Sequence, residues 1–178
     1  MNLPKEYEWL YKELGPRILV EALKDYGIKE TPGSGNTPII MKWAKDLNID
    51  WYTQDSIPWC GLVMGAWAAH AGYPYNKNLL LEAKSWENWG TKISKDKSML
   101  GDVLTFTRNG GGHVGLYIGE DKDSFCIYGG NQSDAVGFTW ILKSRLNSVS
   151  RSPFKIGQPK NVRKIYLKRT GEISTNEA

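Results

Sequence analysis

The sequence predicts an α+β fold in which N-terminal helices pack on an antiparallel β-sheet. Helical patterns fill the first half of the chain, whereas strand patterns begin near residue 101. Helices followed by strands, without regular alternation of the two, are typical of this class. The 178 residues contain no internal repeat and no linker rich in Pro or Ser, which favours one domain. We expect that domain to span residues 1–170, with 1–15 as a helical extension and 171–178 as a flexible tail.

Four segments of the first half have helical patterns. The second carries an apolar stripe and is followed by Gly27, a residue type common just after a helix. The third opens with Thr37-Pro38, an N-cap residue followed by proline at the first helical position. The fourth is strongly apolar and is followed by Gly72 and Pro74. The segments are residues 5–14, 17–26, 38 to about 47, and 59 or 60 to about 72.

Strand patterns follow in the second half. Runs rich in β-branched and aromatic residues are separated by the glycine-rich turn 108–112 and the polar turn 120–123. Runs joined by such short turns are expected to pair as antiparallel hairpins. We predict strands at residues 102–107, 113–119 and 124–132, with weaker candidates at 137–141 and 162–169.

Composition excludes several classes of protein. Apolar residues make up 40% and charged residues 24%, as in ordinary globular proteins. The longest apolar stretch, around residues 62–69, is far shorter than the roughly 20 residues of a membrane span, so we expect no stable membrane insertion. Pro4, Lys5 and Glu6 stand where a signal peptide needs apolar residues, which predicts synthesis in the cytoplasm without a signal peptide. The net charge is +4, and the positive residues are scattered along the chain. The charge alone therefore does not identify a binding partner.

The segment DSIPWCGLVMGAWAAHAG, residues 55–72, is the strongest local feature. Cys60 stands at the expected first turn of a buried helix, where the helix dipole lowers the pKa of a thiol and favours a nucleophilic thiolate. A small apolar residue inside an apolar helix is the equal alternative, because buried cysteine is common.

A nucleophilic cysteine needs a base, and the chain has two histidines. His70 follows Cys60 by ten residues on the same helix, which separates them by about 15 Å along the axis and about 80° around it. We expect His70 to lie in the last helical turn. His113 opens a strand after a glycine-rich hairpin that leaves space beside an imidazole. The alternative for His113 is a polar residue that ends a tight turn.

The third candidate is Asn131, in the segment YGGNQ at the end of the strand expected to pair with that of His113. Its amide oxygen is suited to accept a hydrogen bond from one imidazole nitrogen, which frees the other nitrogen to take the thiol proton. An asparagine that stabilises a turn is the alternative. Cys126 precedes Asn131 by five residues, so strand alternation places it on the other face as a core thiol.

Five motifs in order carry a family resemblance: IPWCGLVMGAWAAHAGY, AKSWENWG, GDVLTFTR, GHVGLYIG and YGGNQSDAV. With the upstream segment 21–40, they resemble phage- and prophage-associated CHAP-like proteins (cysteine, histidine-dependent amidohydrolase/peptidase) related to NlpC/P60. The similarity covers roughly residues 16–153. It implies a papain-like fold, with Cys60 as nucleophile, His113 as base and Asn131 as orienting residue. Many NlpC/P60 relatives have a second histidine where this chain has Asn131.

Three residues near the cysteine are further candidates for oxyanion or substrate binding. Gln54 is placed to donate to an oxyanion alongside the backbone N–H of Cys60. Asp55 is a candidate to cap the helix approach or to bind a substrate amine, and Trp59 flanks the nucleophile.

The resemblance implies a peptidoglycan hydrolase that cleaves an amide or peptide bond of the stem peptide by a Cys-His-Asn mechanism. We expect a monomer that acts on the bacterial cell wall, binds no nucleic acid and needs no cofactor or metal. Two histidines 43 residues apart do not supply the three ligands of a zinc amidase. No carboxylate pair is as well organised as a glycosidase requires. A non-catalytic wall-binding or virion structural module with the same fold stays open as the alternative.

Overall fold

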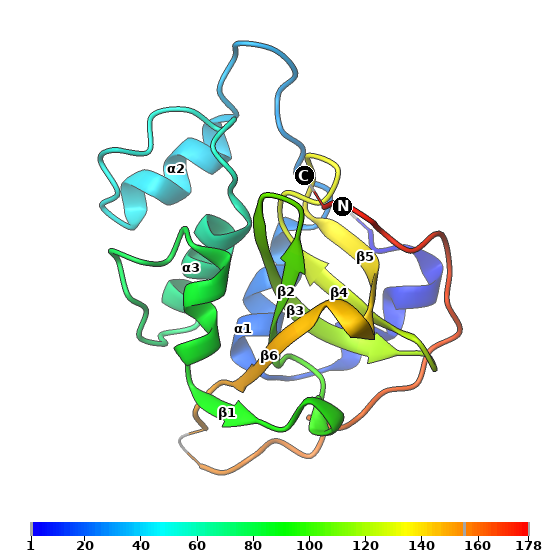
Figure 1. The fold of residues 1–178 in the computed structure, drawn as a ribbon. Coiled ribbons are helices and arrows are strands. Elements are labelled where there is room, and N and C mark those ends of the chain that lie inside the picture. Colours follow the sequence, from blue (N-terminus) through cyan, green and yellow to red (C-terminus); the bar gives the residue numbers. More distant parts are fainter. Residues whose placement is uncertain (1, 155, 178) are drawn as a thin grey trace.

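The computed structural model describes residues 2–154 and 156–177, and it is a mixed α/β structure built around one antiparallel sheet. Figure 1 shows helices α1, α2 and α3 gathered on one side of a strongly twisted sheet. The α+β class and the predicted order of helices before strands are therefore confirmed. Among the described residues, no helix combines the length and apolar character that a membrane crossing requires.

The four predicted helices lie where the sequence patterns place them, with shorter bounds, and the short 3-10 helices η3, η4 and η5 were not predicted. The expected first helix is a 3-10 helix, and the second divides into a short α-helix and a 3-10 turn. The third begins at Pro38, as the Thr37-Pro38 pair predicts. The elements are η1 (Lys5–Lys12), α1 (Arg17–Ala22), η2 (Leu23–Asp25), α2 (Pro38–Asp46), α3 (Cys60–His70), η3 (Ala83–Asn88), η4 (Lys95–Lys97) and η5 (Lys143–Arg145).

Six strands form the sheet in the order β1-β6-β2-β3-β4-β5, and every neighbouring pair is antiparallel. The pairing of β3 with β4 confirms the expectation that the two strands are antiparallel neighbours. The strands are β1 (Thr91–Ile93), β2 (Val103–Arg108), β3 (Gly111–Glu120), β4 (Ser124–Gly129), β5 (Gly137–Leu142) and β6 (Leu146–Arg151).

Strand β6 has no counterpart among the sequence predictions. The serines of β6 interrupt the apolar pattern by which a strand is predicted. Ser148 and Ser150 are nevertheless buried, and neighbouring residues form hydrogen bonds with their hydroxyl groups. The Ser148 hydroxyl shares a hydrogen bond of 2.8 Å with that of Thr105, and Ser150 donates to the carbonyl of Glu87. Polar residues are tolerated inside a sheet when partners from elsewhere in the chain complete their hydrogen bonds.

The predicted strand at residues 162–169 is wrong. The backbone of that segment pairs with the sheet at Glu120, the last residue of β3, where it exchanges hydrogen bonds through Ile165 and Leu167, and Ile165 also hydrogen-bonds the hydroxyl of Tyr117. Because β3 already has β2 and β4 as neighbours, the segment pairs with it only beyond Val103, the first residue of β2. Its apolar residues instead pack against the apolar clusters on the two sides of the sheet.

The sheet separates two apolar clusters. On the helix side, residues of α1, α2 and α3 pack against Val114, Leu116 and Ile118 of β3 and against Cys126 of β4. On the other side, a smaller cluster includes Phe106 and Tyr117. Alternate residues of β3 therefore face opposite clusters, as period-two strand geometry requires. This arrangement places the first turn of α3 against the start of β3.

Candidate functional site

Cys60 is the first residue of α3, and its side chain is only 3% exposed. The preceding Trp59 has φ −111° and ψ 11°, so the chain turns abruptly into the helix. Gly61 lets the helix start lie directly against the segment that follows it, because a Cβ there would stand 2.2 Å from the carbonyl oxygen of Leu80. The sequence prediction for the position of this cysteine in the helix is confirmed.

His113 lies near the start of β3, opposite Phe106 of β2, and its ring is 1% exposed. Gly111 and Gly112 precede it in the hairpin. A Cβ at Gly112 would stand 3.1–3.4 Å from the side chains of Lys84 and Ala83, so η3 packs closely against this part of the hairpin. The His113 side chain points to the other face of the hairpin, the face of its partner Phe106, and is almost out of contact with solvent.

The residue hydrogen-bonded to His113 is Gln132, one position beyond the predicted Asn131. The Nε2 atom of His113 lies 3.2 Å from Oε1 of Gln132. The Gln132 amide nitrogen donates to the carbonyls of Gly129 and Gly137, which leaves its oxygen facing the ring. Because that oxygen can only accept, Nε2 of His113 carries the ring proton and Nδ1 is the free basic nitrogen.

Asn131 is buried but adopts a left-handed backbone conformation, with φ 56°. Strand β4 has already ended at Gly129, so side-chain alternation no longer holds at this point. Asparagine adopts left-handed backbone conformations more readily than glutamine does. Of Asn131 and Gln132, Asn131 is therefore the residue that forms the turn. That preference is the sequence signal that identifies Gln132 rather than Asn131 as the partner of the ring.

The ionisation of the two groups differs from the sequence expectation. Burial raises the pKa of the Cys60 thiol, and this effect exceeds the lowering by backbone N–H groups and by the charge of Arg108. The prediction of a lowered thiol pKa is therefore wrong, because desolvation outweighs the helix terminus. Burial also lowers the pKa of His113 to about 4, although Glu177 and Gln132 act in the opposite direction. At neutral pH the ground state therefore has a protonated Cys60 thiol and a neutral His113 imidazole.

The backbone of Val114 connects the surroundings of the cysteine with those of the histidine. Its N–H interacts with the Cys60 thiol, and Val114 directly follows His113. Arg108 acts electrostatically on both groups. Within the part of the chain that the structure describes, no hydrogen bond joins the thiol to the ring. Catalytic hydrogen bonds are often long in a free enzyme and shorten when substrate binds.

The three other candidates near Cys60 have different surroundings. Gln54 is exposed, and its carbonyl accepts a hydrogen bond from the backbone of Ile57 in a turn. Asp55 is 3% exposed and accepts from the N–H of Thr37 at 2.6 Å, so its carboxylate anchors the start of α2. Trp59 is fully buried and donates from Nε1 to Glu30. None of these side chains is shown in contact with the Cys60 thiol.

The remaining cysteine and histidine lie away from this site. Cys126 is completely buried on the helix side of the sheet, where its thiol lies 3.4 Å from the hydroxyl of Tyr7 and burial raises its pKa to about 12. Both cysteines are free thiols. His70 is the last residue of α3 and is exposed, at the opposite helix end from Cys60.

Sequence reasoning missed three charged residues around His113. Arg145 and Glu177 form a two-pronged ion pair, with distances of 2.8 and 2.7 Å between guanidinium nitrogens and carboxylate oxygens. Arg108 donates from Nε to the carbonyl of Gly112 at 3.1 Å. No short-range pattern joins these residues, because Glu177 reaches the site through the C-terminal segment. The described residues contain no cluster of three or more histidine, cysteine or acidic side chains arranged to hold a metal ion.

Comparison with protein-family models gives no match, and comparison with curated proteins gives no similar sequence. The functional interpretation therefore depends on the geometry of the site.

Proposed function

We propose that this chain is a cysteine hydrolase in which Cys60 is the nucleophile, His113 the base and Gln132 the residue that orients the base. The observation that carries the proposal is the hydrogen bond from His113 to Gln132, because it assigns the free basic nitrogen to Nδ1. The packing of the start of α3 against the start of β3 supports the papain-like arrangement that the resemblance of the sequence motifs to NlpC/P60 and CHAP proteins implies.

In the proposed reaction, the Cys60 proton moves to Nδ1 of His113 as the sulfur attacks the carbonyl carbon of the scissile amide. The C–N bond then breaks, the imidazolium protonates the leaving amine, and a thioester remains on Cys60. Water, deprotonated by the same ring, cleaves the thioester and regenerates the thiol. The backbone N–H of Cys60 at the helix start is placed to stabilise the oxyanion, whereas the exposed side chain of Gln54 is less suited to this role.

The proposed substrate is an amide or peptide bond in the stem of bacterial peptidoglycan. Support comes from the five motifs that resemble CHAP-like wall hydrolases and from the thiol chemistry of the site. The test is mass spectrometry of fragments released from purified peptidoglycan, which also identifies the bond that is cleaved. Cys60→Ser should abolish release, Cys126→Ser should retain most of it, and EDTA should leave it unchanged.

Equal loss of activity in the Cys60→Ser and Cys126→Ser variants would contradict the assignment of the nucleophile. Loss on chelation that zinc restores would contradict the metal-free thiol mechanism.

A non-catalytic wall-binding module is the second candidate, and one observation favours it. A pocket of about 560 Å³ beyond the end of α3 is lined by aromatic residues, including Tyr75, Trp86 and Trp89. Its volume is within the range of small-molecule sites, and the partly exposed rings of Tyr75 and Trp89 are suited to stacking on sugars, whereas Trp86 is buried. If this candidate is correct, Cys60→Ser should bind peptidoglycan as well as the unaltered chain does, and neither protein should release fragments.

A further inference from the structure

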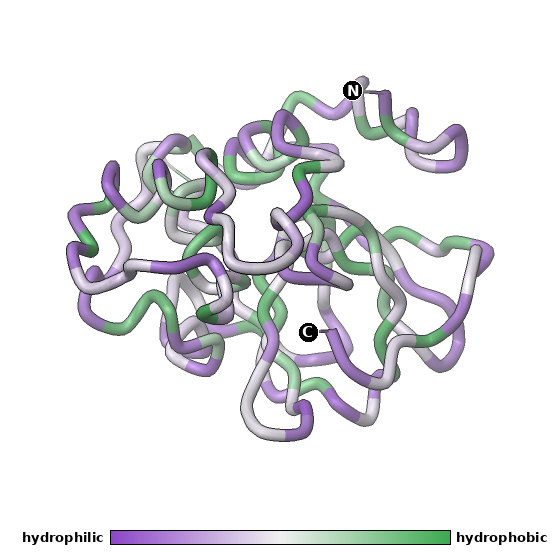
Figure 2. Tube along the Cα trace, turned by 90° about the horizontal axis from the view of Figure 1, so that it is seen from above, coloured by the Kyte–Doolittle hydropathy of each residue, from purple (hydrophilic) through white to green (hydrophobic). Residues whose placement is uncertain are grey.

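The C-terminal segment, residues 173–177, is bound to the sheet instead of projecting as the expected flexible tail. The N–H of Ser174 donates to the carbonyl of Trp140 at 2.8 Å, and Ile173 forms a bridge with the same residue. Further along, the carbonyl of Glu177 accepts from the N–H of Ser133 at 3.3 Å. In both Figure 1 and Figure 2 the C-terminal end lies within the outline of the molecule.

Glu177 ends this segment with a buried carboxylate. Its side chain is 0% exposed, that of Arg145 is 17% exposed, and the two make a pair of parallel hydrogen bonds. Arg145 also donates to the carbonyl of Ser174 at 3.0 Å, and Arg108 donates to the side chain of Asn176 at 3.2 Å. Two-pronged contacts of this kind are how arginine recognises carboxylates in peptides and substrates.

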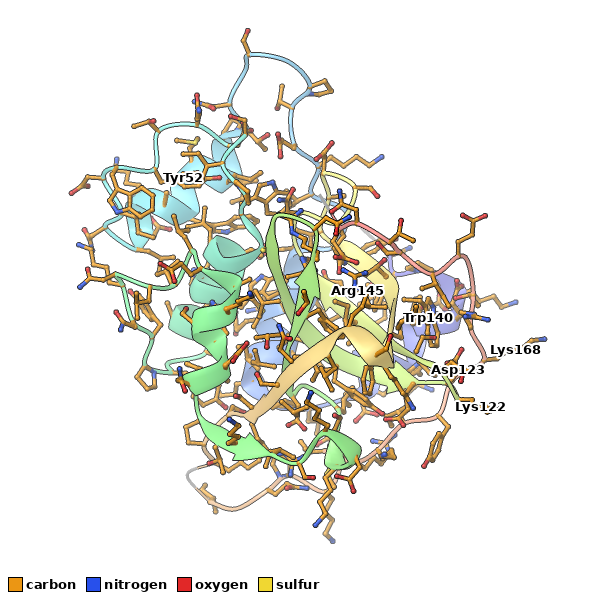
Figure 3. The ribbon with its side chains drawn as sticks, viewed as in Figure 1. Tyr52, Lys122, Asp123, Trp140, Arg145 and Lys168 are labelled. Atoms are coloured by element: carbon orange, nitrogen blue, oxygen red, sulfur yellow. The ribbon has the colours of Figure 1, made fainter. Side chains whose placement is uncertain are left out.

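The two arginines are held in place by the hairpin that carries His113. Nε of Arg145 donates to the carbonyl of Thr107, and Nε of Arg108 donates to the carbonyl of Gly112, next to the histidine. These contacts use only Nε of each guanidinium group, and the terminal nitrogens contact the segment 173–177. Figure 3 shows Arg145 among the strands, with Trp140 on the side of the C-terminal segment. Glu177 lies close enough to His113 for each group to favour the charged form of the other.

We propose that Arg145, with Arg108 beside it, forms a carboxylate-binding subsite next to His113, and that the segment 173–177 occupies this subsite until a carboxylate-bearing peptide displaces it. The inference rests on the proposed function, because it assigns an acidic peptide as the substrate class and the chain's own segment 173–177 as its competitor. The backbone contacts of the segment with Trp140 and Ser133 show how an extended peptide would lie beside the site.

The first test measures how fast iodoacetamide alkylates Cys60 in the Cys126→Ser background, which requires no hydrolysis. Removal of residues 173–178, or the change Glu177→Gln, should raise the alkylation rate at least about tenfold, the factor that about 1.4 kcal/mol of lost segment binding produces. Glu172→Gln is the matched control, since Glu172 is exposed and has no ion pair among the described residues. Equal rates in all four proteins would overturn the proposal.

The second test uses the truncated chain and a synthetic peptide of residues 171–178, with binding measured by calorimetry. The peptide should bind and should return the alkylation rate to that of the full chain. The peptide with Glu177→Gln, and truncated protein carrying Arg145→Lys, should each bind at least about tenfold more weakly, because both lose the two-pronged contact. Equal binding of both peptides, or none of either, would show that Arg145 and Glu177 are a structural pair only.

The alkylation and peptide-binding measurements test the carboxylate subsite, whereas the release of wall fragments tests the proposed hydrolase activity. Segment-dependent alkylation and peptide binding without release of wall fragments would contradict peptidoglycan hydrolysis and leave the subsite in place. Release of fragments at the same rate with and without residues 173–178 would contradict the subsite and leave the hydrolase in place.

Discussion

At the scale of single residues, the site combines a buried thiol, a buried imidazole and an amide that determines the tautomer of the ring. His113 and Cys60 are each almost without solvent contact, so both groups are held in their uncharged forms. Gln132 supplies the one polar contact that gives the ring a defined orientation. Each of these properties leads to a separate expectation for a substituted protein.

His113→Ala should lower turnover by about 10²–10⁴-fold, because the thiol loses its proton acceptor. The rate of Cys60 alkylation near neutral pH should fall with it. His70→Ala is the control, since His70 is exposed at the far end of α3 and should change neither rate. Alkylation rates measured against pH for both variants check this, and a large loss in His70→Ala would mean that the other histidine is the base.

Gln132→Ala should lower turnover by about tenfold to a hundredfold, less than loss of the base itself, because the ring stays but its orientation is no longer held. Gln132→Glu should recover much of the activity, since a carboxylate also accepts a hydrogen bond from Nε2. Nitrogen NMR of the ring should report loss of the Nε2–H tautomer in the alanine variant. Asn131→Gly is the control, because glycine adopts φ 56° without strain.

If Asn131→Gly lost the tautomer and Gln132→Ala kept it, Asn131 would be the orienting residue, as the sequence motif predicts.

At the scale of elements, the start of α3 depends on close contact with the segment after it. Gly61→Ala would bring a methyl group to 2.2 Å from the carbonyl oxygen of Leu80, a backbone atom that cannot move alone. We expect a loss of about 1–3 kcal/mol in the free energy of unfolding and a displaced Cys60. Urea denaturation and the Cys60 alkylation rate measure the two effects.

Gly65→Ala is the matched control on the same helix. A Cβ at Gly65 would stand 3.2–3.3 Å from the ends of the Leu80 and Leu47 side chains, which can adjust. Alanine also improves helix propensity by up to about 1 kcal/mol over glycine, so stability should change little. Similar losses in both variants would mean that the contact of Gly61 with the Leu80 backbone has no special effect.

At the scale of the whole molecule, burial of His113 links stability to pH. Its pKa is about 4 in the folded chain, against 6.5 for a solvated histidine, so the unfolded chain binds the additional proton between these values. The stabilisation is complete above pH 6.5 and is lost as pH falls, by about 3 kcal/mol on reaching pH 4. Urea denaturation from pH 7.5 to 4 should show this loss, and His113→Asn should remove it.

His70→Asn should retain the profile of the unaltered chain, because its ring is exposed. The buried carboxyl of Asp102, whose pKa is raised by burial, acts in the opposite direction but is present in all three proteins. Parallel profiles for the unaltered chain and His113→Asn would contradict the burial of a neutral histidine.

Local patterns in the sequence were sufficient for much of this protein. The first turn of α3 at Cys60, the strand that begins by His113, and the antiparallel pairing of that strand with the next all follow from short-range periodicity, glycine-rich turns and proline positions. These signals act within a few residues, because backbone conformation is set largely by neighbouring side chains. The α+β class follows from their order along the chain.

Other features were decided only by tertiary structure. The partner of His113 is Gln132 because the chain leaves regular strand geometry at Gly129, where alternation no longer predicts which side chain faces the ring. The thiol pKa rises because packing removes water from Cys60, and strand β6 forms because distant groups satisfy its serines. Glu177 meets Arg145 across 32 positions of sequence. Burial and long-range contact depend on how distant segments pack together, and no local pattern in a single sequence encodes that packing.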